Sequence, residues 1–390
     1  MTMVIKKDTV MLFETPNLDE REREVLERIN GLKEKLQWQL HEPRRWFGSL
    51  RRLSFARAIQ GSNSIEGYVA GLDDAAAVAV GQEPLDADEE TTLALEGYRD
   101  AMTYVLQLAS ESDFVYSTQM LKSLHFMMTK YSLRNRPGLW RSGTVYVREE
   151  ESGKIVYEGP DLDEVPGLMN VLVHSLNRGG DEEPVITAAM AHLNLVMVHP
   201  FRDGNGRMAR CLQSLVLARS GVLSPVFMSI EEYLGRNTRQ YYDILAEVGK
   251  GRWSPSNDAR PWTRFTLRAH LRQAMTLLRR VRESERAWVE LERMVDEASL
   301  PVRVMSLLFE ASLGLRVRNA TYRASLREMD EEISEQTASR DFKQLVDLGL
   351  LVAEGERRGR FYTAGESITK LRRAIVADRD PRDDRDPFGD

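Results

Sequence analysis

The sequence is nearly without cysteine: Cys211 is the only one among its 390 residues, so an intramolecular disulfide is excluded. A chain without disulfides is typical of a reducing compartment. No run of apolar residues is long enough to cross a bilayer, and residues 1–12 contain no signal-peptide core. We therefore expect a cytoplasmic protein that does not bind membranes.

The chain also has no excess of positive charge: its formal net charge is -6 at pH 7. This balance disfavours a protein that coats nucleic acid along its whole length. Motifs typical of zinc sites are absent as well: with no HExxH segment and no cysteine pair, His192 and His199 lack further ligands at suitable spacing. With 42% hydrophobic and 29% charged residues, the composition is that of a globular protein with two or three domains.

Hydrophobic periodicity predicts a mainly α-helical protein. Apolar residues recur at helical spacing over residues 17–108 and 117–131, and on both sides of a glycine-rich loop near residue 204. The best β-hairpin candidate joins residues 144–147 to 154–157. The tail is expected to be disordered, because six Asp, three Arg and two Pro between residues 378 and 390 cannot bury a core. The predicted segments are an N-terminal helical region (1–115), a core (116–275), a linker helix (276–300), a C-terminal module (301–366) and the tail (377–390).

The C-terminal module has the pattern of a winged-helix domain. Three helical candidates, 303–313, 320–329 and 334–348, precede two short strands, 350–353 and 360–363. Residues 301–365 carry ten basic and ten acidic side chains, so the module offers few contacts to phosphates; only the tip between the strands, with Arg357, Arg358 and Arg360, is basic. We therefore favour protein contact or homodimer formation for this module and keep DNA binding as the alternative.

The chemistry of the chain is concentrated in the loop near residue 204. Its polar residues include His199, Asp203, Arg207 and Arg210, and glycines occupy positions 204 and 206. The glycines let the backbone approach a ligand, and the loop opens a helix whose unpaired N–H groups and dipole favour anions. Arg207 and Arg210 lie three residues apart and project from one side of the first turn. The combination predicts a polyphosphate site.

Two side chains of the same loop supply the other requirements of phosphorus transfer. Asp203 offers one hard oxygen ligand, which suits a Mg²⁺ ion that keeps most of its waters and bridges phosphates. His199 can take up a proton near neutral pH. A phosphate cradle, a metal ligand and a base in one loop favour in-line transfer of a phosphorus group to a hydroxyl.

Two other interpretations of the loop fit less well. Residues 204–209 match a loose GxGxxA dinucleotide-binding pattern, but that pattern requires a preceding strand, and here a helical stretch precedes it. The other interpretation is a polar turn between two helices with His199 as a structural histidine, which leaves the rest of the constellation unexplained.

Residues 199–210, HPFRDGNGRMAR, resemble the signature of the Fic family, HxFx(D/E)GNGRxxR, without a departure. The resemblance extends from about residue 50 to about residue 275. It implies a helical bundle with a short β-hairpin flap, in which His199 is the general base and Asp203 the Mg²⁺ ligand. The other roles that it implies are an anion hole from Gly204, Asn205 and Gly206, phosphate contacts from Arg207, a γ-phosphate contact from Arg210, and a core anchor in Phe201.

Features outside the signature resemble the family as well. Glycine at both 204 and 206 is similar to the branch that transfers nucleotides, in which the α-phosphorus is attacked and pyrophosphate leaves, although phosphocholine transfer stays open. Tyr241 and Tyr242 resemble the pair that walls the adenine pocket, or are two half-buried helix aromatics. The resemblance also implies that the hairpin at Val145, Tyr146 and Val147 is a flap that pairs with the main chain of a target.

The segment SNSIEG at residues 62–67 resembles the inhibitory pattern (S/T)xxxE(G/N), here N-terminal to the signature. Gly67 indicates a helix end, so Glu66 adds negative charge where the helix dipole is already negative, at a cost of about 0.3–1 kcal/mol. A cation elsewhere would offset this cost, and Arg210 is the natural candidate. The resemblance implies an inhibitory segment of Ser62, Glu66 and Gly67 that occupies the arginine needed by the γ-phosphate. The alternative is a surface Glu near a helix end.

The sequence therefore predicts a protein adenylyltransferase (AMPylator) that uses ATP and Mg²⁺ and is inhibited by Glu66. Its partner is a protein with an acceptor hydroxyl on Tyr, Thr or Ser, and the chain itself can be that partner. Two alternatives stay open. One is a DNA-binding regulator whose core senses a nucleotide, and the other is removal of AMP from a modified protein, with Glu66 positioning the attacking water.

Overall fold

The elements of the chain are known from a computed structural model that describes residues 11–40, 46–148, 155–180, 182–221, 229–356, 359–381, 383 and 385–389. The N-terminal helices are α1 (Glu20–Leu40), α2 (Phe47–Ser64), α3 (Leu72–Ala79) and α4 (Glu89–Leu108). The central elements are α5 (Thr118–Thr129), η1 (Leu133–Asn135), β1 (Tyr146–Arg148), β2 (Ile155–Glu158), η2 (Leu162–Glu164), α6 (Val165–Arg178), α7 (Pro184–Val198), α8 (Asn205–Arg219), α10 (Glu231–Arg236) and α11 (Thr238–Gly249). The C-terminal elements are α12 (Arg260–Glu297), α13 (Val304–Ser312), α14 (Asn319–Arg327), α15 (Glu335–Asp347), β3 (Leu351–Glu354), β4 (Phe361–Ala364) and α16 (Glu366–Ala377).

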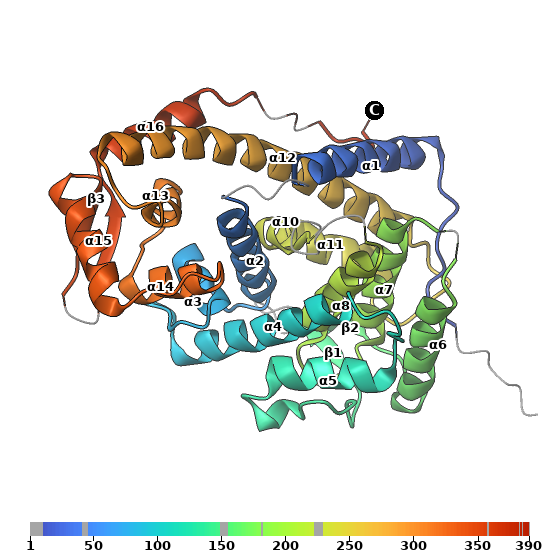
Figure 1. Cartoon of the computed structure of the whole chain (residues 1–390). Coiled ribbons are helices and arrows are strands. Elements are labelled where there is room, and N and C mark those ends of the chain that lie inside the picture. Colours follow the sequence, from blue (N-terminus) through green and yellow to red (C-terminus); the bar gives the residue numbers. More distant parts are fainter. Residues whose placement is uncertain are drawn as a thin grey trace, which may run out of the picture.

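The predicted fold class is confirmed, because helices make up most of the molecule and two short hairpins are its only described sheets (Figure 1). The predicted central hairpin is formed by β1 and β2, which pair antiparallel with Val147 opposite Tyr157. Its first strand begins at Tyr146, two residues later than residue 144. Residues 149–154, which join the strands, lie outside the described part.

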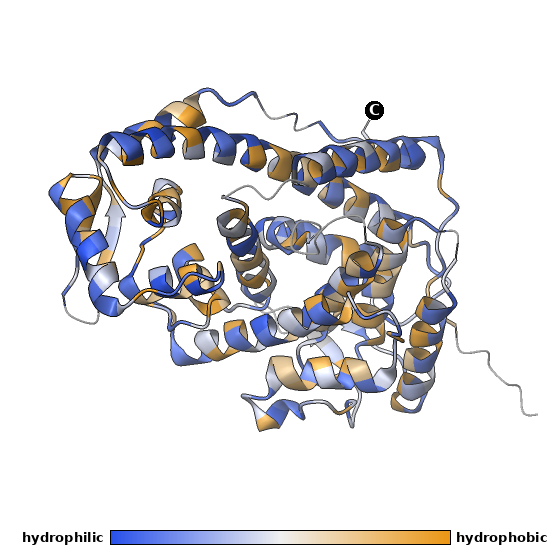
Figure 2. Cartoon of the chain, viewed as in Figure 1, coloured by the Kyte–Doolittle hydropathy of each residue, from blue (hydrophilic) through white to orange (hydrophobic). Residues whose placement is uncertain are grey.

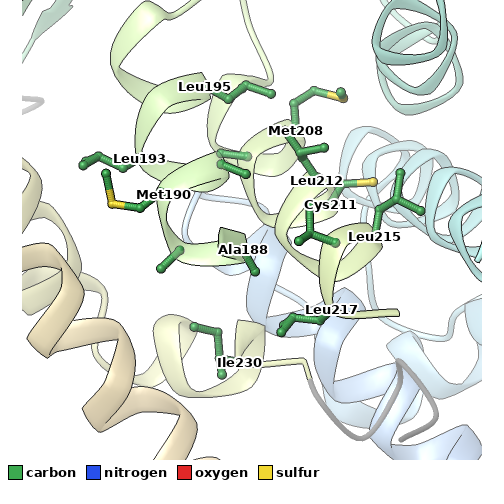
Figure 3. Packing of buried hydrophobic residues seen from close by; sticks show 14 of the residues in the cluster. Ala188, Met190, Leu193, Leu195, Met208, Cys211, Leu212, Leu215, Leu217 and Ile230 are labelled. Carbon is green, nitrogen blue, oxygen red and sulfur yellow. The ribbon is translucent and has the colours of Figure 1, made fainter. Parts of the chain in front are cut away.

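Helices α7 and α8 form the centre of the larger core. Figure 3 shows side chains of both helices meeting, with Cys211 beside Leu212 and Leu215. Cys211 is fully buried, and burial raises the pKa of its thiol, so it is an inert core residue. Because the two helices are packed along their lengths, the loop between them is held rigidly at one end of the pair.

Two hydrophobic cores share the long helix α12. The larger core extends along the chain from Phe13 to Leu271, and the second continues from Ala274 through α16. Figure 2 shows hydrophilic and hydrophobic residues alternating along α12, as expected for a helix with one face on a core. The predicted division after residue 275 therefore falls inside one continuous helix of 38 residues, because the apolar periodicity continues across it.

Helix α2 also connects the two cores. Trp46 and Leu50, at its beginning, belong to the second core, whereas Ile59 and Ile65, at its end, belong to the larger one. Between them, the buried guanidinium of Arg52 forms an ion pair with Glu310 of α13. The segment that carries Glu66 is thus anchored to the C-terminal module at its other end.

The C-terminal module contains the elements that the sequence predicts, in the same order. Helices α13 to α15 precede the antiparallel pair β3–β4, and the Ser334 hydroxyl caps α15 by accepting a hydrogen bond of 3.1 Å from the backbone N–H of Thr337. Arg357 and Arg358 of the predicted basic tip lie outside the described residues. The winged-helix interpretation and the choice between DNA and protein partners stay predictions.

The tail has no helix or strand among its described residues after Ala377, but it makes ion pairs with α12. The expectation of disorder rests on the inability of this composition to bury a core. Composition alone does not reveal the ion pairs between the tail carboxylates and arginines of α12. In the described part of the chain, no helix is long and apolar enough to span a membrane.

Candidate functional site

The loop between α7 and α8 owes its shape to two residues in the left-handed region. His199 ends α7 with φ 51°, and Gly204 begins α8 with φ 74°. The side-chain amide of Asn205 accepts a hydrogen bond from the backbone N–H of Phe201 and donates one to its carbonyl, both at 2.9 Å. Phe201 is buried and stacks on His125 with ring centroids 3.8 Å apart. Asn205 therefore contributes its side chain to loop geometry, while its backbone lies in the first turn of α8.

The environment of His199 fixes its tautomer. The Nδ1 atom lies 3.1 Å from the carbonyl oxygen of Val196, which can only accept, so Nδ1 carries the proton and donates it. The Nε2 atom is left with its lone pair. Burial lowers the pKa of His199 below its ordinary value, which outweighs the opposing effect of the Val196 hydrogen bond. His199 is therefore neutral at pH 7 and able to accept a proton at Nε2.

Two buried guanidinium groups lie at the N-terminal end of α8. Arg207 contacts the hydroxyl of Tyr131 at 3.2 Å and the carboxylate of Asp203 at 3.6 Å. Arg210 donates from Nε to the Ser62 hydroxyl at 2.8 Å and from one terminal nitrogen to the Ser62 carbonyl at 2.9 Å. Within the described residues, Nε of Arg207 and the other terminal nitrogen of Arg210 have no hydrogen-bond partner. Two buried cations with unused donors beside a helix N-terminus make a strong anion site.

Glu66 lies directly against this anion site. Its carboxylate oxygen Oε1 is 2.6 Å from a terminal nitrogen of Arg210, and the Glu66 side chain is 23% exposed. A Cβ atom on Gly206 would overlap the same oxygen, so the carboxylate occupies the space above the first turn of α8. Burial lowers the pKa of Arg210, but the charge and hydrogen bond of Glu66, together with Tyr241 and Tyr98, outweigh burial and raise it. The structure thus contains the ion pair between Glu66 and Arg210 that the sequence predicts.

The remaining residues of the inhibitory pattern hold this arrangement. Helix α2 ends at Ser64, and Gly67 has φ 87°, a conformation that turns the chain away after Glu66. Ser62 is fully buried and supplies two of the oxygens that Arg210 contacts.

Asp203 lies at the edge of the site with its side chain 40% exposed. Its carboxylate accepts a hydrogen bond of 2.7 Å from the side-chain amide of Asn135, and Nε2 of His125 lies 3.0 Å from its backbone carbonyl. Nδ1 of His125 accepts from the backbone N–H of Gly138 at 2.9 Å, so Nε2 is the donor. Burial lowers the pKa of His125 to about 4, which keeps this bridge neutral.

Sequence reasoning missed the residues that support the loop. Asn135 and Gly138 come from a segment that reads only as a turn. His125 and Tyr131 come from the segment 117–131, whose apolar pattern predicts a packed helix. Arg141 was also missed, although it donates from Nε to the carbonyl of His199 at 3.1 Å. No motif marks these positions, because each acts through a contact between segments far apart in the sequence.

The two tyrosines of α11 have different environments. Tyr241 is buried, and its hydroxyl lies 3.0 Å from Nε2 of His192. Tyr242 is 45% exposed and donates to the carbonyl of Ile65 at 3.0 Å, next to Glu66. The pair is therefore adjacent to the site, but Tyr242 alone presents an exposed ring. A role in binding adenine stays a prediction for both.

The predicted flap has one free edge within the described residues. Strand β2 continues into a pairing of Glu158 with residues 251–253, whereas β1 pairs only with β2. Tyr146 is 44% exposed, and the carbonyl of Val145 accepts from Gly159 N–H at 3.2 Å. The side chain of Val147 lies outside the described part.

Residues 115–217 match the Fic/DOC family. The chain carries a Fic domain. It is 30% identical to "Protein adenylyltransferase Fic" of Culex quinquefasciatus over 187 residues, which are 45% of this chain and 34% of that protein. It is 26% identical to the protein of the same name from Nematostella vectensis over 269 residues, 65% of this chain and 55% of that protein.

A solved structure shares the fold over most of the chain. It is a Fic family protein from Desulfovibrio desulfuricans, with a TM-score of 0.57 and 21% identity, and the likeness covers 90% of this chain and 98% of that one. At this identity the likeness concerns the fold, and it supports the mainly helical Fic architecture predicted from the sequence. The chain spans about a third of the length of the Culex relative, so the activity of that whole protein does not transfer directly to this chain.

Proposed function

We propose that the Fic domain transfers AMP from ATP to a hydroxyl group of a protein. The observation that carries the proposal is the pair of buried guanidinium groups, Arg207 and Arg210, at the N-terminus of α8, with donors that no described residue uses. Burial of two such cations is costly, and within the described chain the carboxylates of Asp203 and Glu66 leave one donor of each guanidinium without an acceptor. A triphosphate has the charge and the several oxygens that this arrangement can bind.

The loop residues fit a nucleotide with its metal ion. The backbone N–H groups of Gly204, Asn205 and Gly206 would contact a phosphate at the helix N-terminus. Asp203 would hold Mg²⁺, which neutralises phosphate charge when bound. The described residues contain no group of three or more His, Cys, Asp or Glu side chains that could hold a metal. One partly exposed carboxylate suits an ion that keeps its waters and also binds the substrate phosphates.

The neutral His199 fits the role of general base. The acceptor oxygen forms a bond to the α-phosphorus of ATP, the bond from that phosphorus to the leaving pyrophosphate breaks, and Nε2 of His199 takes the hydroxyl proton. The Nδ1 bond to Val196 keeps Nε2 unprotonated, and Arg141 holds the backbone of His199 in place. The imidazole therefore does not need to reorient before it accepts the proton.

Glu66 would restrain this reaction. Its carboxylate lies at Arg210 and over Gly206, where a phosphate would otherwise bind. An anion fixed there repels the γ-phosphate and displaces the rest of the triphosphate from the position for attack. The free edge of β1 would bind an extended segment of the protein acceptor by backbone pairing. A cytoplasmic location and a protein partner for the C-terminal module complete the proposal.

Labelled ATP tests the reaction type. The Glu66→Gly variant is incubated with ATP that carries the label at either the α- or the γ-phosphate. AMP transfer requires protein-bound label from the α position alone. Label from the γ position alone would mean phosphoryl transfer, and no label from either would remove the transferase proposal. Release of AMP from a protein that already carries it would favour the alternative reaction, the removal of AMP with Glu66 positioning the attacking water.

A further inference from the structure

A second polar site lies along α12. A cleft of about 810 Å³ is bounded by α10, α11, α12 and the tail that follows α16. Its described lining includes none of the residues of the Fic signature. Gln240 of α11 lines the cleft, as does Asn237 just before this helix, whereas Tyr242 of α11 reaches Ile65 at the Fic site.

Arginine dominates the walls of this cleft. Apart from the tail residues, the lining has two acidic side chains, Glu232 and Glu283. Its basic side chains are Arg236, Arg268, Arg272, Arg279, Arg282 and Arg286. The arginines of α12 recur at intervals of three, four or seven residues, so they lie on one face of the helix. Both glutamates are shared among several arginines: Glu232 binds Arg280 through both oxygens at 2.6 Å and Arg236 at 2.7 Å. Glu283 binds Arg379 at 2.7 Å and Arg279 at 3.6 Å. The arginines of α12 that line the cleft, called the arginine row below, therefore keep a net positive charge.

The tail of the chain lies on this arginine row and runs antiparallel to α12. Asp378 pairs with Arg286 at 2.6 Å, and Asp386 pairs with Arg268 at 2.7 Å. Between these pairs, Arg272 donates to a backbone carbonyl of the tail. Figure 1 shows the tail returning from α16 along α12 toward α1. An extended segment with spaced carboxylates thus matches the arginine row over most of its length.

The end of the tail adds an apolar contact. The ring of Phe388 lies 5.4 Å from the guanidinium of Arg264 and packs against the larger core. The ion pairs that precede it are accessible to water: the side chains of Asp378 and Asp386 are 61% and 45% exposed. Exposed ion pairs are individually weak and are screened by salt, so the tail can be displaced.

We propose that this cleft is a docking site for an extended acidic segment of a partner protein, and that the tail is its internal competitor. A tethered ligand acts at roughly millimolar effective concentration, which is enough to occupy a weak site while leaving it open to exchange. Both the carboxylates and the backbone carbonyl of the bound segment are used, which fits a peptide. The proposal concerns binding and is independent of the reaction at the Fic site.

A labelled peptide with the sequence of residues 381–390 tests the proposal by fluorescence anisotropy. The protein is a variant that ends at Asp380, so that the pair between Arg379 and Glu283 is kept. This variant should bind the peptide, and the full chain should bind it about tenfold or more weakly, because its own tail competes. Added salt should weaken binding, and a peptide with every Asp replaced by Asn should not bind.

Charge reversal identifies the site. In the shortened protein, Arg268→Glu combined with Arg272→Glu should abolish peptide binding, because these two arginines contact Asp386 and the carbonyl of Arg385 in the full chain. The control is Arg293→Glu, which reverses a charge on the same helix at a residue paired with Glu290 and Glu297, outside the cleft. Equal binding by the full and shortened chains, or binding that survives the double reversal, would overturn the proposal. Tighter binding of a single-stranded oligonucleotide than of the peptide would assign the cleft to nucleic acid instead. None of these binding measurements needs ATP, so their outcome is independent of whether the Fic domain transfers AMP.

Discussion

The contact between Glu66 and Arg210 allows the effect of Glu66→Gly to be worked out from the geometry. The wild-type carboxylate lies 2.6 Å from the guanidinium and over the backbone of Gly206. The substitution removes this charge and leaves Arg210 with its two contacts to Ser62. The position of Glu66 in a turn after α2 means that glycine costs no helical hydrogen bond.

Two effects should then raise the rate of transfer. Two unit charges of like sign about 4 Å apart repel by about 4 kcal/mol at an effective dielectric constant of about 20. Because Glu66 is partly exposed, roughly 2–3 kcal/mol is a more suitable figure, and this corresponds to about 10²-fold. Misplacement of a reacting group by about 1 Å costs a similar factor of ~10². These effects overlap, so we expect AMP incorporation to rise by about 10²-fold or more.

The same substitution should lower the stability of the nucleotide-free protein. Removing one partner of a buried ion pair costs about 3–5 kcal/mol, and the contacts to Ser62 place the expected loss near the lower end. ATP supplies a new anion for Arg210, so it should raise the Tm of the variant more than that of the wild type. Differential scanning fluorimetry with and without Mg-ATP measures this difference.

Three further variants distinguish specific inhibition by Glu66 from a general destabilisation of the N-terminal helices. Glu66→Gln keeps the size of the side chain and should activate, because the charge is lost. Arg210→Ala should gain nothing, since the γ-phosphate loses its ligand, and the double variant Glu66→Gly/Arg210→Ala should behave like Arg210→Ala. Incorporation from α-labelled ATP is compared across the series. Equal incorporation by the wild type and Glu66→Gly, or activation by Arg210→Ala, would refute the reasoning.

The remaining predictions concern the base, the first turn of α8, the supporting histidine and the link to the C-terminal module. His199→Ala should reduce transfer by ~10²–10⁴-fold with nucleotide binding retained. Where His199 is present, the rate should rise with pH with its midpoint below pH 6.5, because the pKa of His199 is lowered. Gly206→Ala should destabilise the wild type by displacing Glu66, and the loss should shrink in the Glu66→Gly background, as a double-mutant cycle by chemical denaturation can show. The pKa of His125 is lowered to about 4, so the unfolded chain binds a proton below about pH 6.5, whereas the folded chain binds it only near pH 4. The free energy of unfolding should therefore decrease as the pH is lowered from about 6.5 to about 4, by up to about 1.4 kcal/mol per pH unit. His125→Asn should flatten that slope in urea titrations. Arg52→Met should raise basal transfer in the same labelling assay, because it cuts the ion pair that anchors α2 to α13; unchanged transfer would mean that the module does not set the position of Glu66.

Local sequence information was sufficient for the fold class and for the loop. The left-handed positions at His199 and Gly204 follow from a helix end and a glycine, and the contiguous signature places its polar residues within a few residues of one another. The pairing of Glu66 with Arg210 could be predicted because residues 62–67 resemble the inhibitory pattern, and because a cation offsets negative charge at a helix end.

Contacts between distant segments could not be predicted from the sequence. Asn135 and Arg141 support the loop through hydrogen bonds to residues more than 50 positions away, and neither position has a periodic or compositional signal. The tail shows the same limit: its composition argues against a core, but its pairing partners on α12 are visible only in the folded chain. The predicted boundary after residue 275 rests on module patterns, and these do not show that the single helix α12 continues across it.

The most direct test of the central claim is the mass of the protein after incubation of Glu66→Gly with Mg-ATP and a protein acceptor, in parallel with Glu66→Gly/His199→Ala. The account predicts an added mass of one AMP on the acceptor or on the chain itself in the first reaction, and no addition in the second. An added phosphate in place of AMP, or an AMP addition that persists without His199, would contradict the assignment of this Fic domain as a protein adenylyltransferase with His199 as its base.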